Sequence, residues 1–477
     1  MLVVKIVDGI KGEEMERELS VAERVMWMSH QVGCANCLFT AHVSGKLDEN
    51  VLRTALDLLA RRHPLLGSRI EVRGIRPFFV SDSVSQIPLR VRTRHGDDDW
   101  HDEAETELND PIRMSAGPLL RAVLIKSDTT AEVLLTCHHI ITDAKSGINL
   151  ISELLELAGQ IMEGNLSPKV TELAAHPPVE EILPREARGV GGFLKAGAFI
   201  VRQLLNALIQ RPSKLPKDSD APPQDCRARL LQRRLSAEET EALLIRCREE
   251  HTTIQGAVCA AVLEAVAGQI HNNQAEAKPI TLTCASAVDL RPVLSRPIKD
   301  EVGNFASIVV TTHRVGPEIH FWKLAQIVKT DLRRAIGRSE PSVSLSLLNK
   351  FLPRKIKPTD LIKTIAKFNS PLMVSNVGVI RIPEKYGPII LRGVHPALSM
   401  TAFPENVEAT VSTYSNQLGV NLSYSEPTMS RKRMTRLMED TMDILQSAAR
   451  LPMTIPSVAA EMRTPPKCFP AETTVKG

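Results

Sequence analysis

The sequence predicts a protein of the mixed α/β (α+β) class that is divided into two domains. The chain has 477 residues, which exceeds what one hydrophobic core usually organises. Strand-like and helix-like segments alternate in both halves, as α/β architectures require. A stretch rich in proline and charge, Pro177 to Pro223, separates these halves. We therefore place an N-terminal domain at 15–176, a crossover at 177–226 and a C-terminal domain at 227–451.

The composition is that of an ordinary globular protein and excludes several classes of function. Apolar residues make up 43% and charged residues 24% of the chain. Aromatic residues amount to only 4% and the net charge is +4, so nucleic-acid binding is not expected. Cys34 and Cys37 form one CxxC without the second pair that a zinc site needs, and we expect no metal.

The sequence also shows no recognisable targeting signal. Residues 1–11 lack the basic region and long apolar run of a signal peptide, and no stretch of about 18 apolar residues indicates a spanning helix. With reduced cysteines, these features predict a cytoplasmic protein, which we expect to be a monomer. The final segment, 452–477, is rich in proline and is expected to be poorly ordered.

The N-terminal domain opens with two helices that carry recognisable start signals. Ser20 and Glu23 have the spacing of a capping box, which predicts a helix over Ala22 to His30. Asp48 is placed to cap a second helix, which should end before Pro64 because the residue preceding proline disfavours helix. Three strands and a helix are then expected at Ser68–Val72, Pro118–Lys126, Ala131–Thr136 and Gly147–Gly159.

An apolar segment inside the crossover, Phe193 to Ile209, has only Lys195 and Arg202 as charges. One interpretation is a helix that is buried or covers a substrate tunnel. The other is a helix that lies in a membrane surface.

The C-terminal domain repeats the same signals. Ser236 and Glu239 again have capping-box spacing. The pattern predicts strands at Leu230–Leu235 and Ile280–Ala287 and helices at Glu238–Glu250, Thr253–Ile270 and Met434–Arg450.

A doubled histidine, His138-His139, follows the third expected strand and is the main candidate for chemistry. A neutral imidazole accepts a proton near pH 7, and general-base help contributes on the order of 10²–10⁴-fold to a rate. Adjacent residues at a strand end point to opposite sides, so one ring can face a cleft while the other packs behind it. Asp143, four residues after His139, can hold the turn or pair with a cation.

The spacing His138-His139-xxx-Asp143 resembles the HHxxxDG signature of a large acyltransferase superfamily. Its members include peptide-synthase condensation domains, alcohol and polyketide-associated acyltransferases, and wax-ester synthases. Other segments match in order: Arg62-His63-Pro64-Leu65-Leu66, Val288-Asp289-Leu290-Arg291-Pro292, Gly303-Asn304-Phe305 and Val374-Ser375-Asn376-Val377-Gly378. Together they span roughly residues 15 to 450.

This resemblance implies two chloramphenicol-acetyltransferase-like domains with an active-site tunnel between them. His139 would take a proton from an acceptor, a small-molecule or lipid alcohol, within a catalytic motif that includes His138 and Asp143. The donor would be an acyl thioester of coenzyme A or of a carrier-protein phosphopantetheine arm, with no permanently bound cofactor. Asp143 would pair with Arg291. Ser375 and Asn376, with Gly378, would line the substrate site and steady the oxyanion.

Two departures leave alternatives open. Ala144 stands where the signature has glycine, and Asp289 stands where many members have asparagine. The resemblance also covers amide-forming condensation enzymes, and a member without catalysis would be a carrier-binding module. Lipid-like substrates together with the apolar segment 193–209 would fit peripheral membrane contact.

Overall fold

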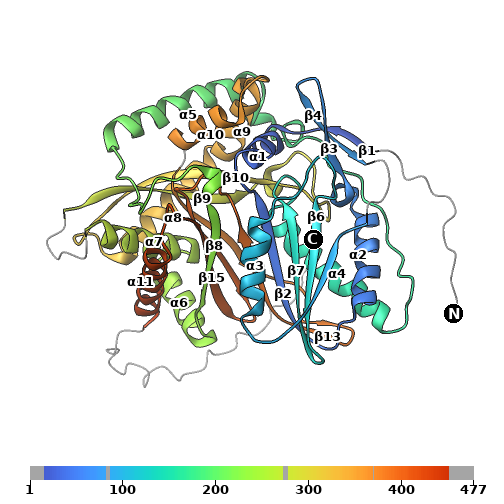
Figure 1. Cartoon of the computed structure of the whole chain (residues 1–477). Coiled ribbons are helices and arrows are strands. Elements are labelled where there is room, and N and C mark those ends of the chain that lie inside the picture. Colours follow the sequence, from blue (N-terminus) through green and yellow to red (C-terminus); the bar gives the residue numbers. More distant parts are fainter. Residues whose placement is uncertain (1–14, 82–85, 272–277, 369, 451–477) are drawn as a thin grey trace, which may run out of the picture.

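The computed structural model describes residues 15–81, 86–271, 278–368 and 370–450. The predicted tail at 452–477 therefore lies outside the described residues. Within the described part, the chain forms two six-stranded sheets, a small three-stranded sheet and a set of covering helices (Figure 1). This is the mixed α/β class that the sequence predicts.

The first large sheet has the strand order β12-β13-β2-β7-β6-β5. Its strands are β2 (Asn36–Ser44), β5 (Leu89–Thr93), β6 (Leu120–Lys126), β7 (Thr130–His138), β12 (Lys385–Tyr386) and β13 (Ile389–Leu398). The second large sheet has the order β10-β9-β11-β14-β15-β8. Its strands are β8 (Arg227–Arg234), β9 (Ile280–Asp289), β10 (Ala306–Val315), β11 (Leu372–Val379), β14 (Val407–Tyr414) and β15 (Gln417–Glu426). The small sheet joins β1 (Met15–Glu18), β4 (Arg76–Ser81) and β3 (Arg69–Arg73).

Helices cover these sheets in two groups. The first group is α2 (Glu49–Arg62), α3 (Asp99–Asn109) and α4 (Ala144–Met162), whereas α1 (Val21–His30) packs against α9 (Glu340–Phe351) and α10 (Pro358–Phe368). The second group is α6 (Ala237–Glu249), α7 (Ile254–Ile270), α8 (Phe321–Gly337) and α11 (Arg431–Ala449). Three further helices lie together at the top of Figure 1: α5 (Gly189–Gln210), α9 (Glu340–Phe351) and α10 (Pro358–Phe368).

Each large sheet has its own hydrophobic core, which lies between its strands and the helices that cover them. In the first core, Phe39 of β2 packs with Leu52 of α2 and Leu154 of α4. The second core gathers α7, α8 and α11 on the other sheet, with Val258 and Leu437 fully buried. Burying such side chains stabilises a fold by about 1.5–3 kcal/mol each.

Hydrogen bonding crosses between the two halves of the sequence. Strand β13, from the C-terminal half, pairs antiparallel with β2 of the first sheet, from Ile390 opposite Ser44 to Leu398 opposite Cys37. The predicted boundaries 15–176 and 227–451 describe continuous stretches, whereas the first sheet draws residues 385–398 from the second stretch. Strand pairing is decided by long-range contacts, which local patterns do not encode.

The start signals read from the sequence have the predicted geometry. Both Ser20 and Ser236 accept a hydrogen bond from the third residue of their helix, and Glu23 and Glu239 bond back to complete the capping boxes. Asp48 accepts from the backbone N–H of Asn50, and α2 ends at Arg62, as predicted.

The described part of the chain contains no disulfide and no single helix that could span a membrane. No single described helix is both long and apolar enough to cross a bilayer; α6 and α7 meet that criterion only as a pair bent by 101°. The seven cysteines in the described ranges, Cys34 and Cys37 among them, are buried free thiols.

Candidate active site

The two histidines lie where strand β7 ends, and their side chains point to opposite sides. The backbone N–H of His138 donates to the carbonyl of Leu119, and that of His139 donates to the carbonyl of Ala35. The backbone is therefore held on both sides of the pair. His139 borders a cavity, whereas His138 is fully buried behind it.

His139 is held as a neutral imidazole in one tautomer. Its Nδ1 lies 2.7 Å from the carbonyl oxygen of Thr142, and a carbonyl can only accept, so Nδ1 carries the proton. The other ring nitrogen, Nε2, is left as a proton acceptor. Burial lowers the pKa of His139 below its usual 6.5, although the Thr142 carbonyl and the Asp143 carboxylate favour the charged form. The ring is therefore neutral at pH 7, with its single proton on Nδ1.

His138 has a different environment. Its Nδ1 accepts from the backbone N–H of Ile140 at 3.0 Å, and its ring packs against that of His30 at 4.4 Å between centroids. Burial lowers the pKa of His138 well below 6.5. The structure thus places His138 beneath the loop, without contact to the cavity that His139 borders.

Asp143 is the N-cap of α4 and the anchor of the histidine loop. Its carboxylate accepts from the backbone N–H of Ser146 at 2.9 Å. Arg291 donates to both carboxylate oxygens, with Nη1 at 2.9 Å and Nη2 at 3.0 Å. Burial acts to raise the pKa of Asp143, but Arg291 and the backbone donors outweigh it and hold that pKa below the usual value. This bidentate ion pair joins two residues that lie 148 positions apart in the sequence.

A segment from the C-terminal half, Gly303-Asn304-Phe305, lies along the same loop. The Asn304 side-chain amide donates to the carbonyl of His139 at 3.1 Å, and the Phe305 backbone N–H donates to Asp143 at 2.9 Å. The Ser146 hydroxyl donates to the Gly303 carbonyl at 2.9 Å. The position of His139 therefore depends on both halves of the chain.

Ser375 and Asn376 border the same cavity as His139, from strand β11 of the second sheet. The Gly378 N–H donates to the side-chain oxygen of Asn376 at 2.9 Å, which leaves the Asn376 amide nitrogen as a donor. Gly378 has a φ of 82° beside a register shift in β11, a conformation that favours glycine. It supports this bulge, and it is not among the residues that border the cavity.

Ala144 stands at the first position of α4, where the backbone is helical. It is not among the described non-glycine residues with positive φ, so the alanine meets no backbone strain. Its side chain borders the cavity with Lys145, whose Nζ lies 2.7 Å from the Asp289 carboxylate. The replacement of the signature glycine therefore adds a methyl group to the cavity wall and leaves the loop intact.

Two cavities meet at His139. The smaller, of about 120 Å³, lies between α4 and strands β9 and β11. The larger, of about 540 Å³, extends toward α1, α9 and α10 and has mostly apolar walls. Five residues border both cavities: His139, Ala306, Met373, Leu398 and Glu408. A molecule in either cavity thus reaches the same imidazole.

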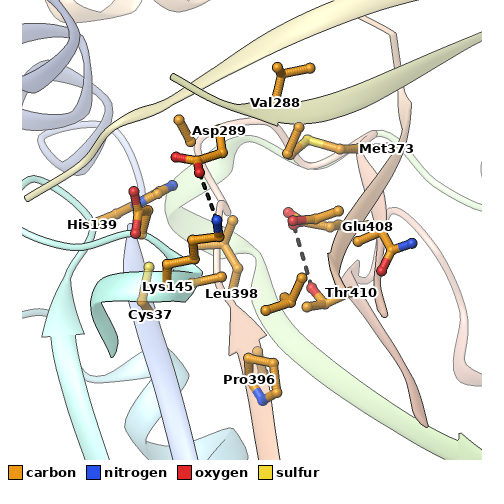
Figure 2. Close-up of a pocket in the computed structure, with 18 of the residues that line it drawn as sticks. Cys37, His139, Lys145, Val288, Asp289, Met373, Pro396, Leu398, Glu408 and Thr410 are labelled. Atoms are coloured by element: carbon orange, nitrogen blue, oxygen red, sulfur yellow. Dashed lines mark hydrogen bonds and ion pairs between the residues drawn. The ribbon is translucent and has the colours of Figure 1, made fainter. Parts of the chain in front are cut away.

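Glu408 is a site residue that the sequence did not reveal. Figure 2 shows it across the cavity from His139, with its carboxylate joined to Thr410. Burial raises its pKa from 4.5 to about 7. The only signal in the sequence was a single glutamate between Val407 and Ala409 in an otherwise uncharged strand. Such a residue does not stand out, because strands often carry one charged side chain that faces solvent.

Part of the chain matches a known protein family. Residues 224–423 match the model described as phthiocerol/phthiodiolone dimycocerosyl transferase C-terminus. The phthiocerol/phthiodiolone dimycocerosyl transferase of Mycobacterium ulcerans (strain Agy99) is 22% identical over 301 residues, which cover 62% of this chain and 67% of that protein. A linear gramicidin synthase of Brevibacillus parabrevis is 30% identical over 173 residues, or 34% of this chain. The matched region spans only 3% of that synthase.

Solved structures share the whole fold. The TRI3 trichothecene 15-O-acetyltransferase of Fusarium sporotrichioides superposes with a TM-score of 0.73 at 13% identity, covering 93% of this chain and 97% of that one. Condensation and epimerization domains of peptide synthetases have the same fold. The chain therefore has the chloramphenicol-acetyltransferase-like fold, and its residues 224–423 are similar to the C-terminal part of the phthiocerol/phthiodiolone dimycocerosyl transferases.

Proposed function

We propose that this protein is an acyltransferase that moves an acyl group from a thioester to an acceptor hydroxyl, with His139 as the general base. The observation that carries the proposal is that two cavities meet at His139, whose Nε2 is the free proton acceptor. One cavity would hold the thioester and the other the acceptor. Both reactants would then touch one imidazole, as a direct transfer without an acyl-enzyme requires.

In the proposed reaction, His139 is the residue that carries the proton from the acceptor to the leaving group. Nε2 of His139 takes the proton of the acceptor hydroxyl while its oxygen attacks the thioester carbonyl carbon. The new C–O bond forms and the carbonyl electrons move to the carbonyl oxygen. Ser375 and the Asn376 amide, which border the cavity, would donate hydrogen bonds to this oxyanion. Collapse of this intermediate breaks the C–S bond. The imidazolium returns its proton to the sulfur, and a thiol leaves.

The donor would be acyl-coenzyme A or an acyl group on a carrier-protein phosphopantetheine arm. The acceptor would be a small-molecule or lipid alcohol, and the large apolar cavity supports an apolar reactant. Asp143, Arg291 and His138 would act through the loop, because the first two hold it from the side and the third packs beneath it.

The test is His139→Ala in the full chain, with acyl-coenzyme A and acyl-carrier donors each offered to a set of alcohols. We expect a loss of at least about 10²-fold in kcat/KM, the lower end of what a general base contributes. His320→Ala, on an exposed histidine, is the matched control and should keep full activity. Unchanged turnover in a folded His139→Ala protein would disprove the base role.

Amide formation is the second candidate, favoured by the 30% identity with a peptide synthase. The same imidazole can take a proton from an amine. Matched alcohol and amine acceptors of equal chain length would separate the two: a larger kcat/KM for the alcohol supports ester formation, and the reverse supports amide formation. Acylated carrier that binds without product for any acceptor would instead favour a carrier-binding module.

A further inference from the structure

Helix α5 has an apolar face that no described element covers. Its inner side packs on α9, where Ala196 and Phe199 meet Val343 and Leu347. On the outer side, Leu194 is 70% exposed and Val201 is 55% exposed. These two residues are seven positions apart and so lie on one stripe of the helix. In Figure 1, α5 is the outermost layer at its end of the molecule.

Basic residues are concentrated around this helix. Segments 188–214 and 350–367 together contain eleven lysine and arginine residues and one acidic residue, Asp360. Their net charge of +10 contrasts with +4 for the whole chain, so the rest of the protein is negative. Arg202 is offset by Glu340 at 2.7 Å, but Lys195, Lys214, Arg354, Lys355, Lys357, Lys363 and Lys367 are exposed. Such a concentration attracts an anionic partner.

The two segments border the same cleft. Phe199 and Ile200 line it from α5, and Lys363 and Lys367 line it from α10. We call the surface formed by the exposed residues of segments 188–214 and 350–367 the α5–α10 face.

The large cavity reaches the surface at this same face. Phe351, at the end of α9, borders the cavity and is 60% exposed. The cavity wall continues inward through Leu348 and Leu361 to His139. An apolar molecule that enters beside Phe351 thus meets apolar walls on its way to the imidazole.

We propose that the α5–α10 face docks on an anionic lipid bilayer, with Leu194 and Val201 inserted among the lipids and the lysines against their headgroups. An exposed apolar stripe flanked by basic residues is the pattern of a helix that lies in a membrane interface. A face that binds only an acidic protein would need the charges but not the exposed leucine and valine. Docking places the cavity mouth at the bilayer, where an apolar reactant would be concentrated.

The experiment is flotation of the full chain with phosphatidylcholine vesicles and with vesicles that contain one third phosphatidylglycerol. We expect recovery with the anionic vesicles to exceed that with the neutral ones at least about fivefold, and to fall with added salt. Leu194→Ser/Val201→Ser and Lys363→Glu/Lys367→Glu should each lower it about tenfold. Since flotation does not depend on catalysis, a failure here is distinct from a failure of the proposed function.

Matched controls lie on other parts of the surface. Val72→Ser/Ile75→Ser changes two apolar residues that are 49% and 44% exposed, and Lys46→Glu/Lys385→Glu reverses two exposed charges. Both controls should float like the unchanged protein. Equal recovery with neutral and anionic vesicles, or no difference between the α5–α10 variants and their controls, would overturn the proposal. Loss of carrier-protein binding in Lys363→Glu/Lys367→Glu, without any vesicle binding, would show a protein-docking face instead.

Discussion

The guanidinium of Arg291 connects the histidine loop to the second half of the chain. It donates to both oxygens of the Asp143 carboxylate and to the hydroxyl of Ser146. Both charges are largely buried, at 15% and 7% side-chain exposure. A buried carboxylate without its partner is costly, because neither water nor another cation replaces the lost bonds.

We therefore expect Arg291→Ala to lower the free energy of unfolding by about 3–5 kcal/mol and to reduce acyl transfer. Arg291→Lys should recover only part of both, since an ammonium cannot bond both oxygens in the same planar geometry. Urea unfolding and steady-state kinetics measure the two effects. If Arg291→Ala unfolded at the same urea concentration as the parent, the pair would have no structural role.

The second prediction for a single residue concerns Glu408 and the pH dependence of stability. Its pKa in the folded protein is about 7, above the 4.5 of a free glutamate, so the folded state retains a proton that the unfolded chain has released. Stability from this residue is then complete below pH 4.5 and is lost as pH rises toward 7. Glu408→Gln removes the titration, so its free energy of unfolding should fall less between pH 4.5 and pH 8.

Urea unfolding at both pH values checks this. The groups that both proteins share contribute equally and cancel in the comparison. A pH difference of the same size in the parent and in Glu408→Gln would mean that the carboxylate is already ionised in the cavity.

At the scale of elements, helix α4 lies directly on strand β2. A Cβ built on Gly147 would overlap the ring of Phe39, which is 2% exposed. The glycine is needed for this close approach, although its backbone is an ordinary helix. The sequence offered Gly147 only as the start of a helix.

Gly147→Ala should therefore destabilise the protein by about 1–3 kcal/mol, the usual cost of extra volume in a packed core. Gly337→Ala, at the end of α8, is the matched control because nothing lies within 4 Å of its added Cβ. That change should be neutral or slightly stabilising. Thermal unfolding of the two variants compares them, and equal midpoints would exclude a steric role for Gly147.

Local patterns located most elements that have their own start or stop signal. The capping serines Ser20 and Ser236 and the stop before Pro64 act within a few residues, so the sequence alone predicts them. It did not predict the pairing of β13 with β2, whose partners lie about 350 residues apart. For α5 the sequence left a buried helix and a surface helix as alternatives. The structure combines them, because the inner side of α5 packs on α9 and its outer side is exposed.

At the scale of the whole molecule, the two halves are bonded into one unit. Besides the β13–β2 pairing, the Asn421 side chain donates to the carbonyl of Pro396 at 2.7 Å, and Asn304 and Arg291 hold the histidine loop. Unfolding of one sheet would break contacts of the other. We therefore expect a single cooperative transition.

The three tryptophans allow this to be measured. Trp322→Phe leaves Trp27 and Trp100 as reporters of the N-terminal half, and Trp27→Phe/Trp100→Phe leaves Trp322 as the reporter of the C-terminal half. Fluorescence and circular dichroism should give coincident urea midpoints within each variant. Separate midpoints for fluorescence and circular dichroism would show that the halves unfold independently.

The sequence by itself determined the fold class, the capped helices and the residues whose spacing resembles an acyltransferase signature, because each depends on neighbours in the chain. Only the tertiary structure decided that His139 borders two cavities while His138 is buried behind it, and that Glu408 lies opposite. It also showed that Asn304 holds the histidine loop from the other half. These relations depend on how strands far apart in sequence are paired, and local periodicity carries no information about that pairing.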